Sequence, residues 1–176
     1  MLIGLAGLKE SGKSTVAKYL SAKHNYVEYE FARPLKEAIK FTFDMTEDQL
    51  YVNKEIVDPR YNLTPRQIMQ KFGTDFIRDM IDPDFFLNKF EYWHKSNSSN
   101  SNVVISDVRF PNELNRIHKL GGKVYLIERT NCDRKQDVHV SEDIISLVSS
   151  IDGIIVNDGT VEDLLRKVEK LILQNE

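Results

Sequence analysis

Residues 7–14 have the types and spacing needed to hold phosphate. They read Gly-Leu-Lys-Glu-Ser-Gly-Lys-Ser and match the pattern G-x-x-x-x-G-K-[ST] without a gap. The two glycines permit a tight turn, and the backbone N–H groups of residues 9–14 can then surround an anionic phosphate. Lys13 can reach the β- and γ-phosphates of a nucleotide, and the Ser14 hydroxyl can bind Mg²⁺. The stretch therefore predicts a nucleotide phosphate site.

The flanking segments supply the context that this pattern requires. Residues 1–6 are short and apolar and end at a glycine, which predicts a buried strand. Residues 16–20 continue as a helix, whose N-terminus adds to the attraction for phosphate.

Bulk properties narrow the class of protein. The chain has 176 residues and a formal net charge of −3, which is enough for one domain with a sizeable core and does not favour nucleic-acid binding. Cys132 is the only cysteine, so no internal disulfide can form, and we expect a reducing, cytoplasmic setting. No apolar run resembles a secretion signal or reaches membrane-spanning length.

Alternating strand and helix patterns predict an α/β fold with a mainly parallel five-stranded sheet flanked by helices. The expected strands are residues 1–6, 26–31, 103–105, 124–127 and 154–156, with the third ending in Ser106-Asp107. The expected helices after the strand at 103–105 are residues 111–120, stopped by Gly121-Gly122, residues 141–149, and a last one capped by Thr160. This division predicts a core of residues 1–32, 102–129 and 150–176, a helical insertion at 33–96 and a lid at 130–142.

Two helices have an apolar face that we expect to be buried. In the insertion, Thr64 and Pro65 begin a helix whose apolar side carries Ile68, Phe72, Phe76 and Met80. The last helix carries the apolar residues Val161, Leu164, Leu165, Val168, Leu171 and Ile172.

Polar residues follow several of the predicted strands. Asp107, Arg129 and Asn157 fall at the carboxyl ends of strands, the same edge as the phosphate loop, and ligands of open α/β sheets bind there. Asp107 can hold Mg²⁺ or accept a proton, although a turn cap is the alternative. Arg109 can bind phosphate through two parallel hydrogen bonds, and an ion pair with Glu113 is compatible with that role.

The insertion carries a row of polar side chains. Arg66, Gln70, Thr74 and Arg78 recur every four residues on one side of the predicted helix. Such a row can bind a substrate phosphate, and a solvent-exposed face is the alternative. Lys36 is a further candidate for the same contact.

Arg129 and Arg134 flank a polar segment that runs to Glu142. Arginines on a loop over phosphates can neutralise charge during phosphoryl transfer and exclude water on closure. His139 lies in this segment, but the four histidines lack ligand spacing, so zinc is not expected.

Several motifs together resemble those of the phage-type deoxynucleoside monophosphate kinases. They are the loop at 7–14, Phe-Ala-Arg-Pro-Leu-Lys at 31–36, Thr-Pro-Arg…Gln…Gly-Thr…Arg at 64–78, Ser-Asp-Val-Arg-Phe-Pro-Asn-Glu at 106–113, Asp…His…Ser-Glu at 137–142 and Asn-Asp-Gly-Thr at 157–160. The likeness runs nearly end to end and in order.

The resemblance implies a P-loop kinase fold and transfer of the ATP γ-phosphate to a deoxynucleoside monophosphate (dNMP), with Mg²⁺ at Ser14 and Asp107. It implies catalytic roles for Lys13, Asp107, Arg129 and Arg134. The expected ATP contacts are Lys9, Glu10, Ser11, Gly12, Lys13, Ser14, Thr15, Asn157, Gly159 and Thr160, the last three beside adenine. The expected dNMP contacts are Lys36, Arg66, Gln70, Thr74, Arg78, Arg109 and Glu142. It further implies a viral enzyme of the host cytoplasm, acting as a monomer or homodimer.

Two other hypotheses remain open on the residues alone. The first is a P-loop kinase for another small phosphorylated acceptor, such as phosphomevalonate or dephospho-coenzyme A. The second is a nucleotide-operated switch. The base-reading pattern Asn-Lys-x-Asp of GTPases is missing, because Asn53-Lys54 is followed by Glu55-Ile56.

Overall fold

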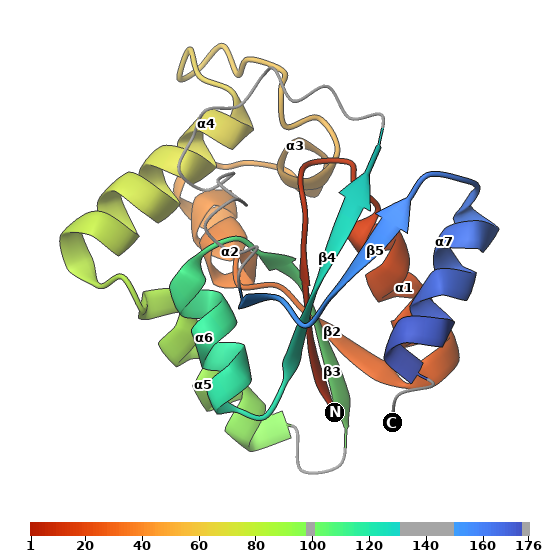
Figure 1. Ribbon diagram of the computed structural model, residues 1–176. Coiled ribbons are helices and arrows are strands. Elements are labelled where there is room, and N and C mark those ends of the chain that lie inside the picture. Colours follow the sequence, from red (N-terminus) through yellow and green to blue (C-terminus); the bar gives the residue numbers. More distant parts are fainter. Residues whose placement is uncertain (98–100, 131–149, 174–176) are drawn as a thin grey trace. The chain divides into compact units, whose positions relative to one another are not determined.

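A computed structural model describes residues 1–97, 101–130 and 150–173 of the chain (Figure 1). The fold divides into two compact units. The first comprises Met1–Glu30 and His94–Glu176, and the second comprises Phe31–Trp93. The predicted lid at 130–142, with Arg134 and Glu142, and the helix predicted at 141–149 lie outside the described residues, apart from Thr130.

The first unit is built on one five-stranded sheet in which every neighbouring pair is parallel. The strand order is β2-β3-β1-β4-β5. The strands are β1 (Leu2–Ala6), β2 (Tyr26–Tyr29), β3 (Asn102–Val108), β4 (Lys123–Arg129) and β5 (Gly153–Asn157). The prediction of a parallel five-stranded sheet is confirmed, and β1, which carries the phosphate loop at its carboxyl end, lies at its centre.

Helices cover both faces of this sheet (Figure 1). On one face α1 (Lys13–His24) packs against β3 and against α7 (Val161–Val168), which continues as η4 (Glu169–Leu173). Ile3, Leu5, Val16 and Leu164 belong to the buried core between them. On the other face α6 (Pro111–Lys119) packs against β1 and β4.

The ends of these helices follow from local sequence. The Thr160 hydroxyl accepts a hydrogen bond from the N–H of Asp163, and the N–H of Thr160 donates one to the Asp163 carboxylate, so Thr160 begins α7 as a capping box. Gly121, with φ of 76°, and Gly122 end α6, because their N–H groups donate to His118 O and Ile117 O. The predicted end of the helix at Gly121-Gly122 is thereby confirmed.

Strand β3 is longer than predicted and contains a β-bulge. It runs to Val108, one residue beyond its predicted end at Ser106-Asp107. Gly4 pairs with Ile105, whereas Ala6 pairs with Val108, so two residues of β3 stand opposite Leu5. One extra residue in one strand is the defining feature of a bulge. Asp107 therefore lies within the strand and not after it.

The second unit is helical. It contains α2 (Arg33–Thr42), α3 (Glu47–Tyr51), α4 (Pro65–Gln70), η1 (Lys71–Ile81) and most of α5 (Phe85–Asn97). Its first residue, Phe31, meets Phe90 of α5 edge to face with ring centroids 5.4 Å apart, and both side chains are buried. The two ends of this unit are thus held together by an aromatic pair.

The apolar face predicted for the helix after Thr64 is partly wrong. Ile68 is buried, but Phe76 is 43% exposed and Met80 is 74% exposed. The reason is that η1 is a π-helix, so its wider turn brings Gly73 and Ile77 to the buried side. A Cβ at Gly73 would collide with Leu35 of α2, so this glycine permits close packing of the two helices.

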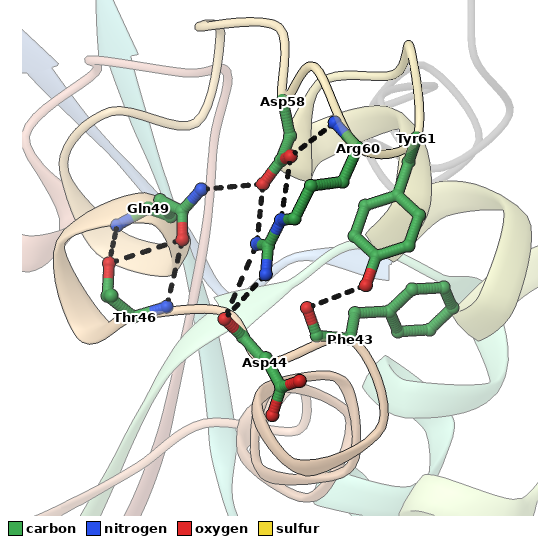
Figure 2. Close-up of polar contacts among 7 residues, drawn as sticks. All are labelled: Phe43, Asp44, Thr46, Gln49, Asp58, Arg60 and Tyr61. Carbon is green, nitrogen blue, oxygen red and sulfur yellow. Dashed lines mark hydrogen bonds and ion pairs between the residues drawn. The ribbon is translucent and has the colours of Figure 1, made fainter.

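A buried aspartate holds the loop between α3 and α4 (Figure 2). Asp58 is 3% exposed and accepts hydrogen bonds from Arg60 Nη2 at 2.7 Å and Gln49 Nε2 at 2.9 Å. Its own N–H donates to Leu63 O at 2.9 Å, which closes the loop. The hydrogen-bonded guanidinium of Arg60 holds the pKa of the Asp58 carboxyl well below its usual value of 3.8. This carboxylate therefore contributes to stability in its ionised form.

Replacing Asp58 by Asn should lower the Tm of the protein by several degrees at pH 7, because Arg60 loses its charge partner. The folded-state pKa is lowered, so the contribution is present above the unfolded pKa and is lost as pH falls below about 3.8. The Tm difference between wild type and Asp58→Asn should therefore narrow on acidification. Asp44→Asn is the matched control, since Arg60 hydrogen-bonds to the backbone oxygen of Asp44, which this change keeps. Equal Tm values for all three proteins at pH 7 would contradict this role.

Candidate nucleotide site

The phosphate loop joins β1 to α1, as its sequence context predicts. Gly7 has φ of 150° and Gly12 has φ of 112°, in the region that favours glycine. A Cβ at Gly7 would lie 2.5 Å from Ile127 O, and one at Gly12 would lie 3.0 Å from both Asn157 Nδ2 and Leu164 Cδ2. Both glycines are therefore needed for conformation and for space.

Lys13 lies at the first position of α1 and its ammonium reaches over the loop. Nζ donates hydrogen bonds to Gly7 O at 2.6 Å and Leu8 O at 2.7 Å. Its side chain is half-buried, whereas the neighbouring Ser14 is exposed. The charge of Lys13 is thus held where phosphates of a nucleotide would enter the loop.

The carboxyl ends of β4 and β5 contact the same loop. Arg129 and Asn157 are direct partners in the register of these two strands. Arg129 Nη1 donates to Glu10 O at 3.2 Å, and Asn157 Nδ2 donates to Ser11 O at 2.9 Å. Three segments far apart in the sequence, which the sequence analysis assigned to one edge of the sheet, therefore meet around the loop.

These segments enclose an open pocket of about 330 Å³, near the lower end for small-molecule sites. Its lining is Glu10, Ser11, Gly12, Lys13, Ser14, Thr15, Arg129, Asn157, Gly159, Val161 and Leu164. The expected contacts Lys9 and Thr160 are not part of this lining. A single pocket therefore contains backbone donors, cationic side chains and two apolar side chains.

Val161 and Leu164 are the pocket residues that sequence reasoning missed as ligand contacts. Both were assigned to a buried apolar face of the last helix, yet Val161 is 54% exposed and lines the pocket. The prediction is wrong for Val161 because the first turn of α7 faces the site instead of the core. Its position directly after the N-cap Thr160 was the available signal.

The segment after β5 is anchored to α7. Lys167 Nζ donates to Val156 O at 2.8 Å and to the carboxylate of Asp158 at 2.5 Å. The hydrogen-bonded ammonium lowers the pKa of Asp158 below its usual value. Asn157 and Gly159, on either side of Asp158, are thereby held at the pocket.

A buried carboxylate holds the short segment between β3 and α6. Asp107, within the bulge of β3, is half-buried. Glu113 is 1% exposed, and its carboxylate accepts hydrogen bonds from the backbone N–H groups of Arg109 at 2.7 Å and Phe110 at 3.1 Å. Glu113 therefore fixes the backbone that carries Arg109 at the start of α6.

The candidate acceptor residues of the second unit have identifiable neighbours within that unit. Arg66 Nε donates to Glu55 Oε1 at 2.6 Å, and the Arg66 side chain is 12% exposed. The Arg78 guanidinium lies 5.0 Å from the ring centroid of Phe86. The Lys36 ammonium lies 3.9 Å from the ring centroid of Tyr51. Gln70 and Thr74 are half-buried.

Metal clusters and membrane-spanning helices are not found in the parts of the chain that the structure describes. Among residues 1–97, 101–130 and 150–173, no three His, Cys, Asp or Glu side chains gather as a metal centre. Within the same ranges no helix has the length and apolar character needed to cross a membrane.

The strand order, the parallel sheet and the loop between β1 and α1 define a P-loop kinase fold. The shikimate kinase of Aquifex aeolicus has this fold, with a TM-score of 0.56 and 20% identity over 99% of this chain and 98% of its own. The dephospho-CoA kinase of Campylobacter jejuni is similar in fold, with a TM-score of 0.54 and 13% identity over 98% and 96%. At these identities the likeness establishes the fold alone.

Sequence comparison identifies the family. The model of the deoxynucleotide monophosphate kinase family matches residues 1–61 and 49–168. A protein of Acanthamoeba polyphaga mimivirus, provisionally assigned as a deoxynucleotide monophosphate kinase, is 37% identical over 96% of this chain and 94% of its own. The deoxynucleotide monophosphate kinase of Enterobacteria phage T4 is 22% identical over 97% and 98%. The chain belongs to the deoxynucleotide monophosphate kinase family, as its motifs predicted.

Gly12→Ala should abolish nucleotide binding, because the added Cβ would crowd Asn157 and Leu164 and strain a backbone with φ of 112°. Gly121→Ala is the matched control. Its φ of 76° carries the same kind of strain, but a Cβ there meets nothing within 4 Å. Calorimetric titration with ADP should show wild-type affinity for Gly121→Ala and none for Gly12→Ala. Comparable ADP affinity in the two variants would contradict the steric argument.

Proposed function

We propose that this protein transfers the γ-phosphate of ATP to a deoxynucleoside monophosphate, giving ADP and the deoxynucleoside diphosphate, with Mg²⁺ as cofactor. The observation that carries the proposal is the phosphate loop with Lys13 over it and Arg129 and Asn157 against it. Such catalysis consists mainly of positioning and charge neutralisation and needs no covalent intermediate.

The loop and Lys13 hold the donor phosphates. The N–H groups of residues 9–14 and the N-terminus of α1 bind phosphate oxygens. Lys13 Nζ exchanges its hydrogen bonds to Gly7 O and Leu8 O for charge-assisted bonds to the β- and γ-phosphates. This exchange places the positive charge where negative charge redistributes during transfer.

Ser14 and Asp107 suit a magnesium ion. Mg²⁺ prefers oxygen ligands and retains several waters, and the exposed hydroxyl at the start of α1 and a carboxylate at the same sheet edge provide such oxygens. A magnesium ion held by these two residues would supply positive charge to offset the charge of the nucleotide phosphates. The protein's contribution is to hold the two oxygen ligands on separate, rigid elements.

The adenine of ATP lies beside the segment that follows β5. Asn157 and Gly159 border the base, and Val161 with Leu164 form the apolar side of its pocket. Thr160, which lies outside the lining, holds this segment by capping α7. Arg129 closes the pocket from β4 and neutralises charge on the transferring phosphoryl group.

The proposed dNMP contacts are polar residues of the second unit and, in the first unit, Arg109. Arg78, Gln70, Thr74 and Lys36 supply donors for its phosphate and base. Arg66 has a mixed role, because its guanidinium also holds Glu55. The lid predicted at 130–142, the role of Arg134 in it and the dNMP contact of Glu142 stay predictions, because these residues, apart from Thr130, lie outside the described ranges.

The sources of the relatives support a viral setting. Both named relatives come from viruses, and we extend the proposal to a viral enzyme of deoxynucleotide metabolism in the host cytoplasm. A monomer or a homodimer is compatible with this role.

An acceptor panel tests the reaction. With Mg²⁺ and ATP, ADP release should depend on one or more of the four dNMPs, and Lys13→Met should reduce kcat at least about a hundred-fold at saturating ATP. The panel also contains the four ribonucleotides, phosphomevalonate and dephospho-coenzyme A. Turnover with one of the last two and none with any dNMP would replace this proposal by another P-loop kinase activity. Wild-type turnover by Lys13→Met would remove Lys13 from the mechanism.

Arg78→Ala should raise the dNMP KM or lower kcat, with little change in ATP affinity. A lost charge-assisted phosphate contact is worth about 1.5–3 kcal/mol. Arg66→Ala should also raise the dNMP KM or lower kcat. Glu55→Gln tests whether this effect comes from the ion pair between Arg66 and Glu55 or from a contact of Arg66 with the acceptor. If Arg66 contacts the acceptor, Glu55→Gln leaves the dNMP KM unchanged while Arg66→Ala raises it. If Glu55→Gln and Arg66→Ala raise the KM equally, Arg66 acts only by holding Glu55. Weaker ATP binding with an unchanged dNMP KM would reverse the assignment of both arginines.

A further inference from the structure

The bulge in β3 changes which face of the sheet each of its residues occupies. Before the bulge, Val104 belongs to the core under α1 and pairs with Ile3, which belongs to the same core. After the bulge, Val108 lies against Gly4, on the face covered by α6: a Cβ at Gly4 would meet Val108 Cγ2 at 3.0 Å and Ile117 Cδ1 at 2.7 Å. In a regular strand, residues four apart share a face. Val104 and Val108 do not, so the extra residue reverses the alternation.

The alternation of side chains along a strand shows which face of the sheet each of the two bulge residues, Ser106 and Asp107, occupies. Counting forward from Val104, Ile105 faces α6 and Ser106 faces α1. Counting backward from Val108, Asp107 also faces α1. Both stand opposite Leu5, which belongs to the core under α1. Two adjacent polar residues therefore share the face on which α1 packs.

This face leads to the phosphate loop. Strand β2 pairs with β3 only as far as Ile105, so the bulge lies beyond the end of β2, at the carboxyl edge of the sheet. Helix α1, which packs against β3, begins at Lys13 at that same edge. Ser106 is 5% exposed and Asp107 is half-buried. The hydroxyl thus lies deeper than the carboxylate.

Without the bulge, only one of the two polar side chains could face the loop. In a regular strand Ser106 would face α1, Asp107 would turn toward α6, and Val108 would replace it at the site. If either Ser106 or Asp107 were deleted, the pairing of Ala6 with Val108 would be kept, but only one polar residue would stand opposite Leu5. The extra residue of the bulge therefore presents a hydroxyl and a carboxylate together on one face of the sheet. Bulges beside active sites commonly change the direction of side chains in this way.

We infer that Ser106 is a positioning residue of the proposed kinase site, whose hydroxyl orients the Asp107 carboxylate and the water shell of the nucleotide-bound divalent cation. This inference rests on the proposed function. A serine hydroxyl donates one hydrogen bond and accepts others, so it can serve a carboxylate and a metal-bound water at once. Residues that hydrogen-bond to a metal ligand fix the orientation of that ligand and are often needed for full metal affinity.

The experiment compares Ser106→Ala with Ser106→Thr, which keeps the hydroxyl, and with Ser101→Ala, which removes a hydroxyl just before the same strand begins. Two readouts are used. The first is the Mg²⁺ concentration that gives half-maximal kcat at saturating ATP and dNMP. The second is the Kd of Mn²⁺ for the enzyme–ADP complex, measured by electron paramagnetic resonance without turnover.

Ser106→Ala should raise both values about ten-fold, the size expected for loss of a hydrogen bond to a charged group. Its affinity for ADP in the presence of a chelator should be unchanged. Ser106→Thr and Ser101→Ala should behave as wild type. If Ser106→Ala lowers the Tm markedly, Ser106→Cys, which keeps the volume with a poorer hydrogen-bonding group, is measured in its place with the same expectation.

Wild-type Mn²⁺ affinity in Ser106→Ala, or in Ser106→Cys where that variant replaces it, would overturn the inference. So would an equal loss of metal-free ADP affinity, because that result indicates a structural role. Failure of the proposed function is distinguishable: the wild-type protein would then phosphorylate no dNMP, while the Mn²⁺ comparison would still report on Ser106.

Discussion

The site depends on one steric constraint, which is the close packing of the phosphate loop against the ends of β4 and β5. At Gly7 and Gly12 no Cβ fits beside Ile127, Asn157 and Leu164. The packing turns backbone N–H groups into a rigid binding surface, and it brings Arg129 and Asn157 within hydrogen-bond distance of loop carbonyl groups. The order of the strands, the register of β4 with β5 and the cap of α7 all serve to maintain it.

Features that depend on local sequence could be predicted. The loop pattern, the apolar strand runs and the caps at Thr64 and Thr160 each act over a few residues, so the strands, the parallel sheet and the nucleotide edge followed from them. The family followed from motifs of the same kind. Lys13, Arg129 and Asn157 lie around one loop because parallel strands end at one edge.

Features that depend on registers between distant segments could not be predicted. The exposure of Phe76 and Met80 depends on the π-helical turn of η1, which places Gly73 against Leu35 of α2. The bulge at Ser106-Asp107 is visible only when β3 is paired with β1. Asp58 gave no signal in the sequence, because its partners Gln49 and Arg60 form no recognised motif. Each of these features depends on a contact between residues whose separation along the chain matches neither the helical nor the strand repeat.

The aromatic pair that joins the two ends of the second unit has a consequence for how such enzymes can diversify. Phe31 and Phe90 meet each other at the ends of the inserted segment, so the segment closes on its own side chains. The polar network centred on Asp58 also joins residues of this unit to one another. Because the segment packs on its own side chains, recombination between relatives could exchange it as a whole while the phosphate loop and its sheet are inherited unchanged.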